Sequence, residues 1–160
     1  MIHPVTLELE PGQLLMANSG CLITQVRAYK DVGLNHFVLV NASSNDLIRP
    51  AIYGSYYRAS FTPSGHQAII GEVLSTVLAG ALCESGDVFT QTKDGLLEYP
   101  ILPPANIEDL IVFHDCGAYG ASMSSNYNNR PLAAEVLIDG DGVRLIRRQQ
   151  TIEKLMGLKD

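Results

Sequence analysis

Residues 133–149, AAEVLIDGDGVRLIRRQ, contain the clearest signal of local structure in the chain. Two arms rich in aliphatic residues flank the turn sequence Asp139-Gly140-Asp141-Gly142. Asp-Gly pairs adopt positive φ angles readily, and the tight turn of a short β-hairpin requires such angles. The stretch therefore predicts an antiparallel hairpin, and it makes β structure the first expectation for the rest of the chain.

Other stretches along the chain also have the patterns of short strands. Their apolar residues alternate with polar ones or form short β-branched runs bounded by turn residues. The expected strands are VTLELE (5–10), CLITQVRAYK (21–30), HFVLVNAS (36–43), HQAIIGEV (66–73), DVFTQ (87–91) and DLIVFHD (109–115). Strands at intervals of about ten residues predict an all-β barrel or sandwich.

Helical patterns are few. QLLMANSG (13–20) is expected to form a short helix, and TIEKLMGLKD (151–160) has helical spacing with Thr151 as its N-cap. Pro50 and Gly54 exclude a long helix or a regular strand from the region around them. ILPPAN (101–106) is expected to be a loop.

The composition excludes several classes of function. The chain has 160 residues, with 17 acidic and 11 basic side chains and a net charge of −6. Nucleic acids and anionic membranes both require a basic surface, so neither is an expected partner. No apolar run is long enough for a membrane span, and the first residues lack the pattern of a signal peptide.

The cysteines and histidines give no indication of a disulfide framework or a metal site. Cys21, Cys83 and Cys116 are odd in number and have no CxxC spacing, so we expect free thiols in a reducing cytoplasm rather than a disulfide framework. The four histidines are scattered, without the spacing of a metal site. We therefore expect no metal.

The polar stretch Cys83-Glu84-Ser85-Gly86-Asp87 is the first candidate site. A thiol beside a carboxylate in a loop can act as an acid or a nucleophile. The alternative is an ordinary turn in which Cys83 packs as a small hydrophobic residue. No histidine lies beside it in the sequence, which weakens a cysteine-protease interpretation.

Two further candidates concern arginine and tyrosine. Arg49 and Tyr53 are one helical turn apart, so a guanidinium and a phenol can face one carboxylate. The alternative is a solvated Arg49 with Tyr53 in the core. Tyr119 lies among small residues in DCGAYGASM (115–123), where a flat ring can approach closely, or where the chain simply bends at a barrel corner.

The order of these motifs is more specific than any one of them. EPGQ (10–13), NDLIRPAIY (45–53), LCESGD (82–87), DCGAYGASM and YNNRPLAAEVLIDG (127–140) follow one another. This succession resembles the C-terminal β domain of the diaminopimelate decarboxylase family, among the alanine-racemase-like decarboxylases that use pyridoxal phosphate. The resemblance extends from about Val5 to Met156, and CESGD is its most specific part.

The resemblance implies a domain organisation. Residues 1–13 correspond to the last strand and turn of a TIM-type barrel, and residues 14–160 to a C-terminal β-barrel domain. The family pairs as head-to-tail homodimers whose active sites lie at the subunit interface. None of the lysines has the context of the cofactor lysine, so the cofactor, pyridoxal 5′-phosphate, is expected to be held mainly by the barrel. The chain alone is expected to be inactive.

The resemblance also implies roles for single residues. Cys83 corresponds to the donor of the Cα proton in the partner's site, and a thiol is protonated at pH 7. Glu84 corresponds to the acceptor for the distal ammonium of the substrate. The other correspondences are Arg49, Tyr53 and Gln13 for substrate binding, and Tyr119, Glu10 and Gly12 for cofactor binding.

One departure from the family pattern concerns the substrate. The family motif EPGR ends in an arginine that helps to bind a distal carboxylate, whereas this chain has Gln13. Glutamine keeps hydrogen bonding but loses the fixed charge. We therefore expect either a decarboxylase of lysine biosynthesis or one that acts on a modified or carrier-bound amino acid in antibiotic or siderophore biosynthesis. A non-catalytic dimerisation domain and an unrelated β-barrel binding module are the remaining alternatives.

Overall fold

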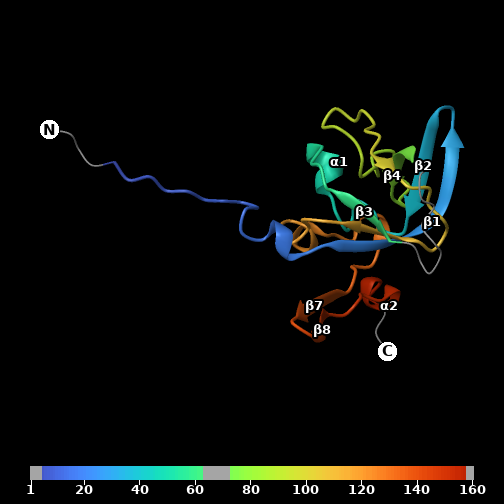
Figure 1. The fold of residues 1–160 in the computed structure, drawn as a ribbon. Coiled ribbons are helices and arrows are strands. Elements are labelled where there is room, and N and C mark those ends of the chain that lie inside the picture. The colour runs from blue at the N-terminus through green and yellow to red at the C-terminus, as the bar shows by residue number, and fades with distance from the viewer. Residues whose placement is uncertain (1–4, 63–72, 158–160) are drawn as a thin grey trace.

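The structure is a computed structural model that describes residues 5–62 and 73–157. Most of its regular structure is β (Figure 1). The elements are η1 (Ala17–Ser19), β1 (Leu22–Val32), β2 (Asn35–Val40), α1 (Arg49–Tyr53), β3 (Ala59–Thr62), β4 (Leu74–Ala79), β5 (Ile101–Leu102), β6 (Leu110–Phe113), η2 (Ala121–Met123), η3 (Tyr127–Asn129), β7 (Glu135–Asp139), β8 (Gly142–Arg147) and α2 (Ile152–Leu155).

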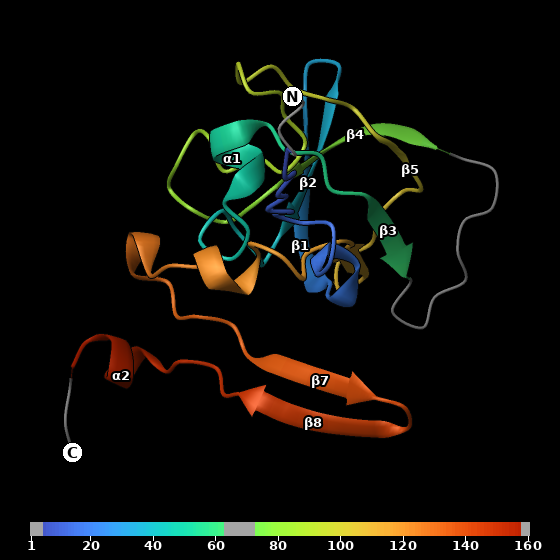
Figure 2. The same cartoon turned by 90° about the vertical axis from the view of Figure 1, so that its left-hand side faces the viewer.

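Six strands form one curved sheet in the order β3-β6-β1-β2-β4-β5. β2 and β4 pair in parallel, and the other neighbours pair antiparallel. The sheet is nearly closed and barrel-like (Figure 2), which confirms the predicted fold class. Its interior is filled by side chains of β1, β2, β4 and β6 together with Phe89, whose ring centroid lies 4.6 Å from that of Phe113.

α1 is a single helical turn with a defined start and end. Pro50 occupies the first turn, where its missing N–H costs no hydrogen bond. Gly54 ends the helix in the left-handed conformation at φ 60°, and its N–H donates to the Pro50 carbonyl at 3.0 Å. This turn places Arg49 and Tyr53 on the same side of the chain.

β7 and β8 form a separate two-stranded hairpin below the main sheet (Figure 2). Its Ile138↔Val143 and Val136↔Leu145 pairs place four exposed aliphatic side chains on one face of the ribbon. We call these four residues the hairpin ladder. α2 follows, and Thr151 accepts a hydrogen bond from the Lys154 N–H at 3.3 Å. The predicted hairpin and the predicted N-cap are both confirmed.

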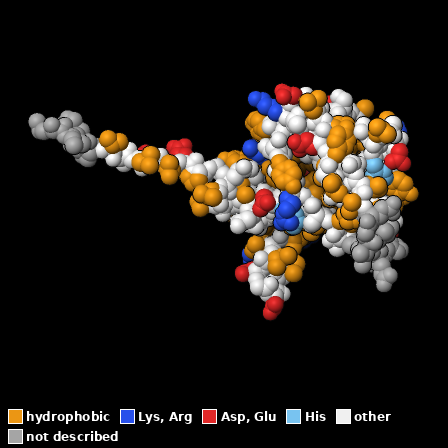
Figure 3. All heavy atoms as spheres, turned by 45° about the horizontal axis from the view of Figure 1, so that its top comes forward, with side chains coloured by type: hydrophobic (Ala, Val, Ile, Leu, Met, Phe, Trp, Pro, Cys, Tyr) orange, Lys and Arg blue, Asp and Glu red, His pale blue; other side chains and the backbone are white. Residues whose placement is uncertain are grey.

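Residues 5–10 are extended and pair with no other described segment, and they run away from the sheet with their apolar side chains exposed (Figure 3). Alternation alone does not supply the neighbouring strand that a ladder requires, so their assignment to the last strand of a barrel stays a prediction. Two other expectations about single elements were wrong. Residues 87–91 form isolated bridges rather than a strand, and the predicted loop at 101–106 begins with β5. The strand expected at 66–73 lies almost wholly outside the described residues.

The short helices also bear on membrane insertion. Among residues 5–62 and 73–157, none of the helices reaches the length and apolar character that crossing a bilayer requires.

Candidate functional site

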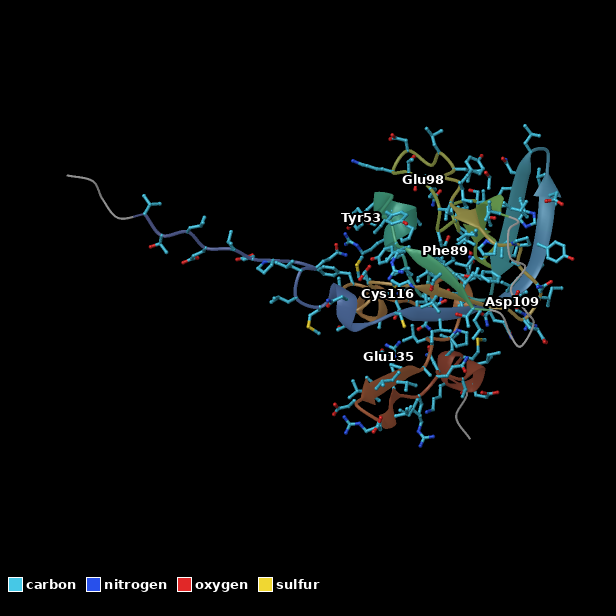
Figure 4. The ribbon with its side chains drawn as sticks, viewed as in Figure 1. Tyr53, Phe89, Glu98, Asp109, Cys116 and Glu135 are labelled. Carbon is cyan, nitrogen blue, oxygen red and sulfur yellow. The ribbon has the colours of Figure 1, made fainter. Side chains whose placement is uncertain are left out.

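Arg49 is the centre of the first group of predicted site residues. Its guanidinium carbon lies 4.9 Å from the centroid of the Tyr53 ring and 5.2 Å from that of Tyr119. A guanidinium over the face of an aromatic ring is attracted by the ring quadrupole, so each ring helps to fix the cation. Tyr53 remains 52% exposed on α1 (Figure 4), so the alternative of Tyr53 in the core is wrong.

Tyr119 is positioned by a strained bend after β6. Its φ of 59° lies in the left-handed region, which a bulky side chain seldom adopts. A Cβ placed on Gly12 would lie 3.3 Å from the Tyr119 hydroxyl oxygen, so the glycine lets the Tyr119 ring lie close to the backbone at this turn. Strain of this kind concentrates at functional sites, and here it turns a half-exposed phenol toward Gly12 and Arg49.

Tyr57 and Gln13 adjoin this group. The Arg49 Nε and the Tyr57 hydroxyl are buried and have no hydrogen-bond partner among the described residues. Burial raises the pKa of the Tyr57 phenol, while the charge of Arg49 and the nearby Gln13 side chain act in the opposite direction. A buried donor left without a partner is costly, so it commonly bonds a ligand or a solvent molecule. The positive charge of the Arg49 guanidinium suits an anionic ligand.

Cys83 and Glu84 belong to a second group, carried by the loop of residues 80–87. Asp87, 4% exposed, accepts hydrogen bonds from the Ser44 N–H at 2.7 Å and the Leu82 N–H at 2.8 Å. The Ala81 N–H donates to the Ser43 hydroxyl at 2.9 Å. These hydrogen bonds fix the backbone of the loop, and Cys83 is exposed at its surface. The alternative in which Cys83 packs as a small hydrophobic residue is therefore wrong.

The Glu84 carboxylate is held on both oxygens. Its Oε1 accepts from the Gly86 N–H at 3.1 Å and the Ser85 hydroxyl at 3.4 Å, and its Oε2 accepts from the Tyr127 hydroxyl at 2.9 Å. The bonds from Gly86 and then Tyr127 lower the pKa of Glu84, because they favour the charged form. Glu84 is therefore an ionised acceptor at neutral pH.

The structure thus assembles the predicted residues as two groups. Arg49, Tyr53, Tyr119 and Gly12 lie together, with Gln13 beside Tyr57, whereas Cys83 and Glu84 lie with Tyr127. Glu10 is exposed in the extended segment. The sequence suggested no role for Tyr57 or for Tyr127, although Tyr127 opens the motif at 127–140, because sequence alone does not show which distant residues they contact.

The residues of the first group can be compared with the needs of pyridoxal phosphate. A half-exposed phenol, a glycine backbone without a side chain and a buried cation donor suit one edge of a flat, anionic cofactor. They do not surround it. The chemistry of these donors fits a contribution from this chain to a cofactor held mainly elsewhere.

The three thiols differ in environment, which leads to a labelling prediction. Cys116 is buried, its Sγ donates to the Phe113 carbonyl at 3.3 Å, and burial raises its pKa to about 12. Its thiolate fraction at pH 8 is then about one in ten thousand. Because the thiolate is the reactive form, iodoacetamide should modify Cys21 and Cys83 in the native protein, and Cys116 only after unfolding. Peptide mass spectrometry with and without guanidinium measures this; equal native labelling of all three would contradict it.

Comparisons with known proteins match both the sequence and the fold of this chain. The family model described as the C-terminal sheet domain of pyridoxal-dependent decarboxylase matches residues 13–117. Diaminopimelate decarboxylase of Escherichia coli K12 is 57% identical over 158 residues, which are 98% of this chain and 38% of the relative. The chain thus spans well under half the length of this relative.

Solved structures of similar proteins agree. A crystal structure of diaminopimelate decarboxylase aligns with a TM-score of 0.88 at 57% identity, covering 98% of this chain and 37% of that one. The enzyme of Helicobacter pylori, crystallised with L-lysine, aligns with a TM-score of 0.79 at 35% identity, covering 93% of this chain and 34% of that one.

Proposed function

The chain belongs to the pyridoxal-dependent decarboxylases as a C-terminal sheet domain, and from this premise we propose that it serves an amino-acid decarboxylase of the diaminopimelate type. In this proposal the chain supplies substrate-binding groups and a proton donor. The observation that carries it is the arrangement of two groups, one cationic around Arg49 and one with an ionised carboxylate beside an exposed thiol. A diamino dicarboxylic acid presents the complementary charges.

The cofactor-binding site would be completed by another part of the enzyme. Bound pyridoxal phosphate withdraws electrons from the substrate Cα and so permits loss of carbon dioxide. Tyr119 and Gly12 would contact it from this chain, together with Glu10, two residues before Gly12. A barrel domain carrying the cofactor lysine would hold the remainder.

The chain's own residues would act on the substrate around that cofactor. Arg49 and Tyr53 would bind a carboxylate, because a guanidinium can grip both carboxylate oxygens while the phenol adds one donor. Glu84 would accept hydrogen bonds from the distal ammonium. Cys83 would deliver a proton to Cα after carbon dioxide is lost. The exposed position of Cys83 and Glu84 on an ordered loop suits delivery into the site of a partner subunit in a homodimer, in a reducing cytoplasm.

Gln13 bears on which substrate the enzyme would accept. With a neutral amide in place of the arginine expected from the family motif, a free distal carboxylate loses one charged partner. This favours, as a second candidate, a substrate whose distal carboxylate is modified or attached to a carrier. Both candidates share the reaction class, decarboxylation of an amino acid. They differ in whether the distal carboxylate of the substrate is free or modified.

The test is an assembled enzyme in which this chain is joined to a cofactor-bearing barrel. We expect carbon dioxide release from diaminopimelate, and we expect Gln13→Arg to lower KM for this substrate about tenfold, the size of one charge-assisted hydrogen bond. Gln149→Arg, which adds the same charge at an exposed position, is the matched control.

The outcomes separate the candidates. Activity on diaminopimelate supports lysine biosynthesis, and activity confined to modified amino acids supports the second candidate. Bound cofactor without decarboxylation of any amino acid would contradict the proposal and favour a non-catalytic domain.

A further inference from the structure

The Tyr127–Glu84 hydrogen bond joins two segments that are far apart in the sequence. The Gly86 and Ser85 contacts to Glu84 are local and fall on Oε1, whereas the 2.9 Å bond from Tyr127 is the contact on Oε2. Local contacts on one oxygen leave the carboxylate plane free to tilt. The bond from Tyr127 fixes the second oxygen and so sets the direction in which the remaining lone pairs point.

Tyr127 is itself held in place through Asn45. The Ser125 N–H donates to the Asn45 carbonyl at 2.9 Å, and the Asn45 amide donates to the Ser125 carbonyl at 3.4 Å. Asn45 is 1% exposed, so this pair is a buried anchor two residues before Tyr127. The Ser125 hydroxyl also accepts a hydrogen bond from the Tyr127 N–H at 3.3 Å.

The loop that carries Glu84 rests on the same short segment. Ser43 binds Ala81, and the Ser44 N–H binds Asp87, so residues 43–45 anchor both the 80–87 loop and the stretch before Tyr127. A hydrogen bond between two unanchored surface side chains loses much of its value to the entropy of ordering them. Here both backbones are fixed by a common base, and the Tyr127–Glu84 distance follows from the fold.

We propose that Tyr127 is a positioning residue that aims the Glu84 carboxylate at the distal ammonium of the substrate and so contributes to selection of amine-bearing substrates. This rests on the proposed function, in which Glu84 accepts that ammonium. The bond also helps to keep Glu84 ionised, because a donor to the carboxylate lowers its pKa. A site built to bind an ammonium discriminates against analogues that lack one.

The test is Tyr127→Phe, which removes one hydroxyl and keeps the ring. We expect KM for diaminopimelate in the assembled enzyme to rise about three- to tenfold, the size of one net hydrogen bond, with kcat changed by less than about twofold. In the 160-residue chain, carboxyl NMR should show the Glu84 pKa moving up, since a donor to its charged form is lost. Tyr29→Phe, at an exposed tyrosine of β1, is the matched control and should change neither quantity.

Glu84→Gln separates this inference from the proposed function. If Glu84→Gln raises KM while Tyr127→Phe changes neither KM nor the Glu84 titration, the role of Tyr127 is overturned and that of Glu84 stands. If Glu84→Gln leaves KM unchanged, Glu84 does not bind the ammonium, and both ideas are overturned on that point. A raised KM in both variants, with a shifted Glu84 titration in Tyr127→Phe, supports the inference.

Discussion

Replacing Cys83 with alanine is expected to lower kcat for decarboxylation by about 10²–10⁴-fold in the assembled enzyme, the usual contribution of a positioned general acid. Cys83 is exposed on a loop whose backbone is held by hydrogen bonds to Asp87 and Ser43, so Cys83→Ala should remove the proposed proton donor while these loop contacts remain. Carbon dioxide release, measured at saturating substrate, reports kcat directly. KM should change little, because substrate binding is assigned to other residues.

Two variants accompany this measurement. Cys21→Ala removes the other exposed thiol and should keep full activity, which excludes a general effect of losing a cysteine. Cys83→Ser keeps the size of the side chain but replaces the thiol by a much weaker acid, so its rate should stay low. Unchanged turnover in Cys83→Ala would remove Cys83 from the mechanism.

Replacing Gly54 with alanine is expected to destabilise the domain by about 2–5 kcal/mol. Gly54 has φ 60°, where a side chain costs about 1–2 kcal/mol. Its Cβ would also lie 2.6 Å from the Thr92 carbonyl carbon and 2.7 Å from the Lys93 Cα, and relieving backbone overlap costs about 1–3 kcal/mol more. Because Gly54 ends α1, the adjustment should also displace Arg49 and Tyr53.

Urea unfolding of the two variants tests this cause. Gly33→Ala is the control, because Gly33 has φ 63° but no atom within 4 Å of the position of a Cβ. It should lose only the conformational contribution, about 1–2 kcal/mol. Equal free energies of unfolding for the two variants would show that the contact with residues 92–93 does not matter.

The sequence predicted those elements whose ends are determined by neighbouring turn and capping residues. The Asp-Gly turn specified β7 and β8, Thr151 specified the start of α2, and Pro50 with Gly54 limited α1 to one turn. Pairing between distant segments could not be predicted in this way. The parallel β2–β4 pair and the short β5 depend on neighbours that no periodicity identifies.

In the candidate site, too, contacts between residues close in the sequence could be predicted, and contacts between distant segments could not. The spacing of Arg49 and Tyr53 predicted that the two side chains lie on one side of a helical turn, and the Arg49 guanidinium does lie over the Tyr53 ring. Their binding of one common ligand stays a prediction. The bend at 115–123 was expected from its glycines, yet the left-handed residues there include Asp115 and Tyr119 rather than glycine. Tyr127 lies 43 residues from Glu84, so only the folded chain shows their contact.

The hairpin ladder has a consequence for handling this polypeptide. Its four aliphatic side chains face outward, and at neutral pH the net charge of −6 provides repulsion between molecules. Near the isoelectric point of about 5.1 that repulsion disappears, while the apolar surface of the hairpin ladder is unchanged. Acidic buffers should therefore precipitate the isolated chain well before they unfold it, and concentrated stocks belong in mildly alkaline solution.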